Sequence, residues 1–189
     1  MKTIYTTIEN IDTDQIIPAR FLKKTSREGF AEAMFHDWRF NADGSIKEDS
    51  IFAPYESTEH PTILVAGKNF GCGSSREHAA WALADYGFTA VVSSSFSDIF
   101  YNNALNNMLL PVKVTPEFLD KIFAALKREK NEEIEIDIKN KTITIASTKE
   151  SKIFPIGEYK QNCLLNRQRD IDFLVSTKNK IEAYENGSK

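Results

Sequence analysis

The chain is poor in the residues on which metal binding and thiol chemistry usually depend. Its 189 residues include two cysteines, Cys72 and Cys163, and three histidines, His36, His60 and His78. Two cysteines are too few to hold an iron–sulfur cluster, and no group of His, Cys and Asp has the spacing of a zinc site. We therefore predict no metal site in this chain. Any metal that its chemistry needs would come from another chain.

The chain also lacks a strong charge bias and a long hydrophobic run. Its formal net charge is −3, with 41% hydrophobic and 27% charged residues, which gives no electrostatic footprint for nucleic acid. No run has the length of a membrane helix, and the N-terminus lacks the apolar core of a signal peptide. Two cysteines far apart in sequence fit a reducing compartment. These features predict a cytoplasmic protein without a nucleic-acid or membrane partner.

Alternating and apolar runs predict a mixed α/β fold, formed as a single domain over residues 1–189. Strands are expected near residues 62–66, 89–93, 111–114, 133–138 and 141–146, the last two as a hairpin. Helices are expected near residues 76–86, 96–107, 116–129 and 168–185, with Thr115 capping the third. The polar stretch 41–50 is expected to be a loop. The pattern leaves the choice between parallel and antiparallel strands open.

The last of these helices is amphipathic, which allows two interpretations. Its apolar residues are Ile171, Phe173, Leu174 and Ile181. They can pack on the core of this chain or contribute to a subunit interface. We favour core packing.

A glycine-rich loop joins the first of the expected strands to the first expected helix. It reads Asn69-Phe-Gly-Cys-Gly-Ser-Ser-Arg-Glu-His78. Gly71 and Gly73 permit positive φ and a close approach of a ligand to the backbone. Free N–H groups and the positive end of a helix dipole suit a carboxylate or phosphate. The loop lacks the signatures of a Walker A motif, a dinucleotide fingerprint and a serine-hydrolase elbow.

The polar residues of this loop allow two interpretations. Ser74 and Glu77 have the spacing of a capping box, so Ser74 can be the helix N-cap. Alternatively, Ser74 and Ser75 supply hydroxyl groups for chemistry. Arg76 would then face an anion, because a guanidinium in the first helical turn otherwise opposes the dipole. For His78 we favour a hydrogen bond to a neighbouring backbone group over catalysis.

Two further polar segments stand out. Near the N-terminus, Asp12 and Asp14 precede an apolar run and a proline, which favours a turn leading into a strand. The functional alternative makes Asp14 an orienting hydrogen-bond acceptor and Arg20 or Lys23 a group for a substrate carboxylate. The second segment carries two asparagine pairs at helical spacing. We favour hydrogen bonding in the fold or at an interface for these four residues: Asn102, Asn103, Asn106 and Asn107.

Three motifs in this order resemble the small subunits of 3-isopropylmalate dehydratase, a branch of the aconitase superfamily. They are Asp12-Thr-Asp-Gln-Ile-Ile-Pro18, the loop of residues 69–78, and Phe96-Ser-Asp-Ile-Phe-Tyr-Asn-Asn103. Phe35-His-Asp-Trp-Arg-Phe40 is similar to the longer, bacterial type. The resemblance implies a swivelling β/β/α domain, as in the aconitase C-terminal domain. It also implies a hydro-lyase of leucine biosynthesis that interconverts 2- and 3-isopropylmalate through 2-isopropylmaleate. A large subunit with a [4Fe-4S] cluster would complete the enzyme, and this chain would bind no cofactor.

The same resemblance assigns roles to residues of the motifs. Ser74, as an alkoxide, would take the proton next to a carboxylate, and Arg76 with nearby N–H groups would stabilise that alkoxide. Ser75 and Arg76 would contact the substrate carboxylate, and Asp14 matches an active-site aspartate. A physical reason supports the first assignment, because an unperturbed serine is far too weak a base without a preorganised positive field.

Substrate choice depends on the loop of residues 21–25 in this superfamily. Leu22 would make an apolar contact with an isopropyl group, whereas Lys23 leaves a cationic contact with a further carboxylate open. The alternatives are therefore a homoaconitate or methylmalate-type isomerase subunit and, from a different class, a non-catalytic carboxylate-binding module. Substrate profiling would separate the first from the leading hypothesis, and independence from a partner would indicate the second.

Overall fold

A computed structural model describes residues 2–23, 29–56, 60–129, 132–176 and 178–187. Its strands are β1 (Thr3–Tyr5), β2 (Ile63–Val65), β3 (Ala90–Ser93), β4 (Leu110–Lys113), β5 (Ile134–Asp137), β6 (Thr142–Ile145) and β7 (Ser151–Ile153). Its helices are α1 (Thr13–Ile16), α2 (Phe30–Ala33), α3 (His36–Arg39), α4 (Glu77–Tyr86), α5 (Asp98–Asn106), α6 (Pro116–Arg128), α7 (Glu158–Asn166), α8 (Asp170–Ser176) and α9 (Lys178–Gly187). Two short 3₁₀ turns are η1 (Ala19–Phe21) and η2 (Ala53–Tyr55).

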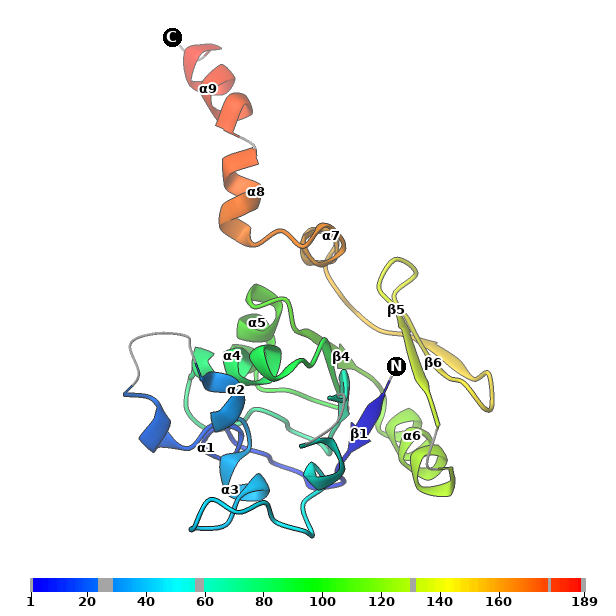
Figure 1. Ribbon diagram of the computed structural model, residues 1–189. Helices are drawn as coiled ribbons and strands as arrows, with labels where there is room; N and C mark the ends of the chain where they lie inside the picture. Colours follow the sequence, from blue (N-terminus) through cyan, green and yellow to red (C-terminus); the bar gives the residue numbers. More distant parts are fainter. Residues whose placement is uncertain (1, 24–28, 57–59, 130–131, 177, 188–189) are drawn as a thin grey trace.

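Four parallel strands form the centre of the molecule in the order β1-β2-β3-β4. Every residue of β2 and β3 is buried, as expected for parallel strands covered on both faces. Alternate side chains of these strands enter two different cores. Leu64 and Val91 pack with the helices α1, α2, α4 and α5, whereas Ile63, Val65 and Val92 pack with α6 and the second sheet. The strands therefore separate two layers, which lie on opposite sides of the sheet in Figure 1.

The second sheet is antiparallel, in the order β5-β6-β7. Its hairpin pairs Ile134 with Ile145 and Ile136 with Ile143, which confirms the predicted hairpin. The inward residues Ile134, Ile143 and Ile145 are buried beside α6. The sequence left the strand direction open. The strands are parallel in the first sheet and antiparallel in the second.

A buried arginine organises the segment between β1 and β2. The guanidinium of Arg39 donates to both carboxylate oxygens of Glu56, at 2.6 and 2.8 Å. It also donates to the carbonyl oxygens of Ala31 and Met34, each at 3.0 Å. Because these bonds join α2, α3 and the residues after η2, Arg39 holds the motif of residues 35–40 in place.

Local sequence signals predict the regular elements well. The five expected strands are present, and Thr115 caps α6 through a bond from Phe118 N to its hydroxyl at 3.3 Å. The polar stretch 41–50 contains turns, as expected. The short strands β1 and β7 and the helices α1, α2, α3 and α7 were not predicted. Across the described residues, every helix falls short of the combined length and apolarity that a membrane crossing requires.

The C-terminal stretch is helical, as predicted, but its predicted packing is wrong. The expected helix 168–185 spans α8 and α9, and residue 177 between them lies outside the described residues. Its apolar side chains are not core residues, because Ile171, Phe173 and Leu174 are all exposed. The side chain of Ile181 lies outside what the structure describes.

Candidate active site

The structure brings the three sequence motifs together around the glycine loop. On one side, Gly71 N donates to Ile11 O at 2.8 Å and Thr13 N donates to Cys72 O at 2.9 Å. On the other side, Phe70 N donates to Ser95 O at 3.0 Å. The loop after β2 is therefore held between the segment after β1 and the segment after β3. All three segments lie at the carboxyl edge of the parallel sheet, where open α/β sheets bind ligands.

Two glycines allow the loop to pass through this narrow space. Gly71 has φ +72°, and a Cβ at this position would lie 2.2 Å from Cγ of Phe100. Gly73 has φ +90°, and its Cβ would lie 3.4 Å from Cβ of Asp12. Both angles are in the left-handed region that favours glycine. The loop can therefore approach α5 and α1 closely and turn its next residues outward.

Ser74 does not cap the helix, so the capping-box interpretation is wrong. Helix α4 begins at Glu77, its N-cap position is Arg76, and no side chain caps it. Ser74 and Ser75 are both exposed. Within the described part of the chain, neither hydroxyl has a hydrogen-bond partner. Both hydroxyls are consequently available to a ligand, which is what the chemical interpretation requires.

Thr13 fixes the backbone of Ser74. The Thr13 hydroxyl donates to the Ser74 carbonyl oxygen at 3.0 Å, across 61 residues of sequence, and Thr13 itself is buried. Thr13 begins α1, where Asp12 is the N-cap and forms a capping box with Gln15 at 2.8 and 2.9 Å. The prediction of a turn leading into a strand is thus wrong. The Asp-x-x-Gln spacing was a signal for this helix start that the sequence reasoning missed.

Arg76 and Asp14 form an ion pair next to the exposed serines. The Arg76 side chain is mostly buried, at 19% exposure, whereas the Asp14 side chain is 51% exposed. Asp14 accepts from Nη1 of Arg76, and a guanidinium carries five N–H donors in all. The pair therefore orients the guanidinium and leaves donors for a second carboxylate.

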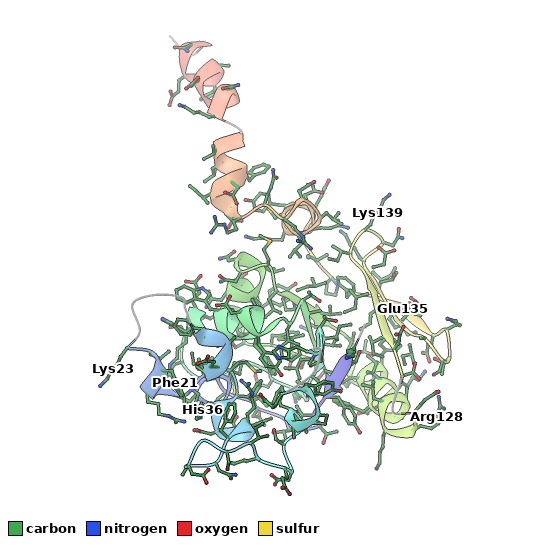
Figure 2. The ribbon with its side chains drawn as sticks, in the orientation of Figure 1. Phe21, Lys23, His36, Arg128, Glu135 and Lys139 are labelled. Atoms are coloured by element: carbon green, nitrogen blue, oxygen red, sulfur yellow. The ribbon has the colours of Figure 1, made fainter. Side chains whose placement is uncertain are left out.

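The residues expected to select the substrate follow η1 and do not belong to the glycine loop. Leu22 is half-buried and packs against the core that contains α1 and α2. Lys23 is exposed and points outward in Figure 2. Arg20, the other candidate for a substrate carboxylate, instead donates to Asp37, with one bond of 3.0 Å. Residues 24 and 25 of this loop lie outside the described residues.

Comparisons with known proteins identify the family. Residues 2–117 match the model of the aconitase C-terminal domain. Over 183 residues the chain is 56% identical to the 3-isopropylmalate dehydratase small subunit of Cytophaga hutchinsonii, covering 96% of this chain and 90% of that protein. The small subunit of Christiangramia forsetii is also 56% identical, with 94% and 85% covered. The chain belongs to the family of 3-isopropylmalate dehydratase small subunits.

A solved structure agrees with this family. The crystal structure of a 3-isopropylmalate dehydratase protein from Methanocaldococcus jannaschii matches with a TM-score of 0.68 and 26% identity. The match covers 97% of this chain and 96% of that one. The predicted α/β class and the fold of the aconitase C-terminal domain are thus confirmed.

Within this family fold, His78 has a packing role that the sequence did not predict. Its ring lies 5.4 Å from the ring of Phe30 and 4.7 Å from that of Trp81. Among the residues described, it makes no hydrogen bond to a backbone group, so the expected hydrogen bond stays a prediction. Three of the four asparagine side chains form hydrogen bonds in the fold, as favoured: Asn102, Asn106 and Asn107. Asn107 donates to Glu77 Oε1 at 3.0 Å and thereby joins α5 to the first turn of α4.

The surroundings of Cys72 disfavour its thiolate form. Burial raises the pKa of its thiol, and the charge of Asp12 raises it further. The thiol is consequently protonated at neutral pH, and it donates to Asn10 O at 3.4 Å. Ser74 and Ser75 remain as the hydroxyl candidates of the loop.

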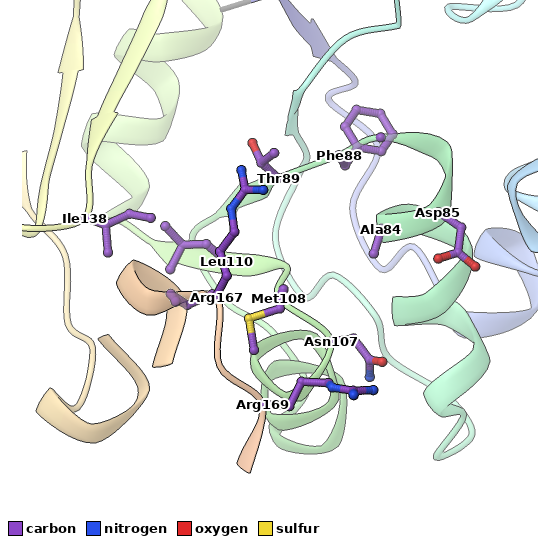
Figure 3. A pocket seen from close by; sticks show the side chains of 12 residues that line it. Ala84, Asp85, Phe88, Thr89, Asn107, Met108, Leu110, Ile138, Arg167 and Arg169 are labelled. Carbon is purple, nitrogen blue, oxygen red and sulfur yellow. The ribbon is translucent and has the colours of Figure 1, made fainter. Parts of the chain in front are cut away.

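The described residues do not fit an iron–sulfur cluster. Both cysteines are free, and nowhere in the described ranges do three or more His, Cys, Asp or Glu side chains gather as a metal site. The cavity in Figure 3 is not the expected site either. It has a volume of about 540 Å³ and is lined by Asp85, Phe88 and Met108 among others, at the carboxyl end of α4. The serine loop lies at the opposite end of that helix.

Proposed function

We propose that this chain is the small subunit of a two-chain hydro-lyase that interconverts 2-isopropylmalate and 3-isopropylmalate through 2-isopropylmaleate. The reaction belongs to leucine biosynthesis. The names of the relatives and the exposed Ser74 loop beside the Arg76–Asp14 pair support this function.

Ser74 is the proposed base. In the dehydration, its alkoxide takes the proton from the carbon that neighbours a substrate carboxylate, while the C–O bond on the adjacent carbon breaks and its electron pair leaves with hydroxide. Net transfer of the proton from the Ser74 hydroxyl to that hydroxide gives water and restores the alkoxide. The rehydration adds a proton and a hydroxyl to the double bond, each on the carbon that carried the other group before. A serine hydroxyl needs a strong local positive field to act as a base. Arg76 and the N–H groups at the start of α4 can supply that field.

Arg76 and Ser75 are the proposed carboxylate contacts. The guanidinium of Arg76 is oriented by Asp14 and retains donors that can bind a substrate carboxylate in a bidentate manner. The exposed Ser75 hydroxyl is adjacent to it in the chain. We assign Leu22 to the isopropyl group and Lys23 to the entrance of the site. A role for Lys23 in binding a further carboxylate would favour a homoaconitate-type substrate.

The large subunit is the proposed partner. Ser74 and Ser75 are exposed, and a preorganised field is strongest when water is excluded, so a second surface must cover them. We assign the [4Fe-4S] cluster of this reaction class to that subunit, because the described residues of this chain offer no ligand set. The free cysteines are consistent with a cytoplasmic location.

One observation carries the proposal. Ser74 is exposed, does not cap α4, and lies next to the Arg76–Asp14 pair. The test combines the purified chain, under anaerobic conditions, with its cluster-loaded large subunit and follows 2-isopropylmaleate formed from 3-isopropylmalate. We expect activity that requires both chains and saturates as the small subunit is titrated. Homoaconitate and methylmalate serve as competing substrates in the same assay.

Two results would contradict the proposal. Turnover of another hydroxy acid in preference to isopropylmalate would assign the chain to a different isomerase. Tight carboxylate binding by the chain alone, with no turnover when the intact large subunit is added, would indicate a binding module.

A further inference from the structure

The chain has one extra residue where it enters the glycine loop. The last pair that β2 forms with β3 is Val65 with Val92. Beyond the strands, an isolated parallel bridge pairs Phe70 with Phe96. Between these two pairs the first segment advances five residues and the second advances four. One residue of the first segment therefore has no residue opposite it, which makes this insertion a β-bulge.

Asn69 is the residue of this bulge with a left-handed backbone. Its φ is +62°, a value that asparagine tolerates better than most residues that carry a Cβ. Its N–H group donates to the Ser95 hydroxyl at 2.9 Å, and Phe70 N donates to Ser95 O at 3.0 Å. The hydroxyl of Ser95 thus replaces a strand carbonyl at Asn69, and backbone pairing resumes at the next residue.

Serines at every second position of the segment 93–97 bond to every second residue of the bulge and loop. The three bonds are Ser93 Oγ to Gly67 O at 2.8 Å, Asn69 N to Ser95 Oγ at 2.9 Å, and Ser97 Oγ to Gly71 O at 2.6 Å. Ser93 is fully buried, and Ser97 also caps α5. Removing the Ser95 hydroxyl is therefore the change that affects the loop most selectively.

The side chain of Asn69 reaches the opposite segment, which follows β1. Its Nδ2 donates to Oδ1 of Asn10 at 2.9 Å, across 59 residues of sequence. Asn10 also has a left-handed backbone, with φ +57°, and its N–H donates to Lys68 O at 2.8 Å. Asn69 therefore connects the segment that carries Asp14 with the loop that carries Arg76.

A bulge determines where the side chains that follow it point. Ser74 comes five residues after Asn69, and Gly71 and Gly73 lie between them. Glycines leave the backbone many conformations, so contacts from outside the loop must fix its register. Left-handed residues other than glycine persist where the surrounding structure holds them, and they are concentrated at functional sites. The contacts of Asn69 meet both conditions.

We propose that Asn69 is a positioning residue of the reaction, held by the Ser95 hydroxyl on one side and by Asn10 on the other. It fixes the register of the glycine loop and thereby places Ser74 and Arg76, and it makes no contact with the substrate. This inference rests on the proposed function for the reaction. The positioning itself can be measured in the isolated chain.

The first experiment removes the acceptor of the Asn69 N–H group. With the cluster-loaded large subunit, Ser95→Ala should lower kcat roughly tenfold to a hundredfold and change KM much less, because the loop is misplaced but keeps its binding groups. Ser95→Thr keeps the hydroxyl and should restore most of kcat. Ser50→Ala is the matched control, since the Ser50 hydroxyl also accepts from a backbone N–H, that of Phe52 at 3.2 Å. It lies away from the loop and should leave kcat unchanged.

A second variant removes the other contact of Asn69. Asn69→Gly accepts positive φ without strain and keeps the N–H group that bonds to Ser95, but it loses the bond to Asn10. We expect kcat to fall roughly tenfold. Because glycine relieves backbone strain, this variant tests the inference even where Ser95→Ala does not fold.

Hydrogen exchange tests the positioning without any turnover. The amides of Gly71 and Thr13 form hydrogen bonds between the loop and the segment after β1. In isolated Ser95→Ala their exchange should accelerate roughly fivefold or more, the change in an opening equilibrium that one lost hydrogen bond gives. In Ser50→Ala it should not change.

Three outcomes would overturn the inference. They are full kcat in a folded Ser95→Ala or Asn69→Gly protein, equal loss of kcat in Ser95→Ala and Ser95→Thr, or unchanged exchange of the loop amides in Ser95→Ala. A pair of unchanged chains that does not turn over isopropylmalate, while the loop amides respond as expected, would instead contradict the proposed function alone.

Discussion

Ser74 is placed by backbone contacts rather than by its own side chain. Its carbonyl oxygen accepts a hydrogen bond from Thr13, while its hydroxyl is exposed and does not cap α4. The carbonyl group of Ser74 thus has the structural role, and its hydroxyl group is left for the chemical one. Substitutions that affect only one of these groups can separate the roles.

Removing the Ser74 hydroxyl should impair turnover without destabilising the protein. For Ser74→Ala we expect kcat to fall by roughly 10²–10⁴, the range for a positioned acid or base. The melting temperature should stay close to that of the unchanged chain, because none of the described residues forms a hydrogen bond to this hydroxyl. Assays with the large subunit and thermal melts measure the two effects.

The neighbouring variant Ser75→Ala is the control. It should act mainly on KM, because Ser75 is assigned to carboxylate contact. Full activity of a folded Ser74→Ala protein would exclude Ser74 as the base.

Thr13 should act through the position of Ser74. Thr13→Val keeps the shape of the side chain but removes the donor to the Ser74 carbonyl, and we expect kcat to fall roughly tenfold to a hundredfold. Thr13→Ser keeps the hydroxyl and should restore most of the activity. If the two variants had equal kcat, the hydrogen bond would have no positioning role.

At the scale of elements, the joint between α7 and α8 depends on charge, because Lys160 Nζ on α7 donates to both carboxylate oxygens of Asp170 on α8, at 2.6 and 2.7 Å. The hydrogen bond from Lys160 lowers the pKa of Asp170 below its usual value. The pair therefore stabilises the joint above the unfolded-state pKa of an aspartate, which is about 3.9. This contribution is lost as the pH falls through the lowered pKa of the folded state.

We expect α8 to separate from α7 in acid. Hydrogen exchange of the α8 amides should be slow near neutral pH and should accelerate, relative to the intrinsic rate, below about pH 4. Lys160→Met should show fast exchange already at neutral pH. Equal α8 protection in the two proteins would show that the Lys160–Asp170 pair does not hold the joint.

At the scale of the molecule, one parallel sheet contributes to both cores. Neighbouring residues such as Ile63 and Leu64 belong to different cores, so neither core can lose its packing without disturbing β2. This shared sheet supports the proposal that residues 1–189 form a single domain. It also joins the Ser74 loop rigidly to the helices on one face.

The body of the chain should therefore unfold in one transition. Scanning calorimetry of the isolated chain should give a ratio of calorimetric to van't Hoff enthalpy of about 1. Two resolved transitions, one of them lost in a variant that disrupts only α6, would show two independent units.

Much of this molecule follows from local sequence. The hairpin of β5 and β6, the Thr115 cap of α6 and the buried strands β2 and β3 all depend on residues within a few positions of one another. The glycine loop was also predicted from its own residues, because positive φ at Gly71 is a local requirement. These features were determined by the sequence alone.

Other features were decided only by the tertiary structure. Arg76 and Asp14 are 62 residues apart, and they meet because the register of β1 on β2 sets the segments that follow these strands side by side. The same pairing of segments decided whether Ser74 capped a helix or faced solvent, because Thr13 in the first segment holds the backbone of Ser74 in the second. The exposure of Ile171 and Leu174 could not be predicted either, because an amphipathic pattern shows that a helix has an apolar face but not what packs on that face.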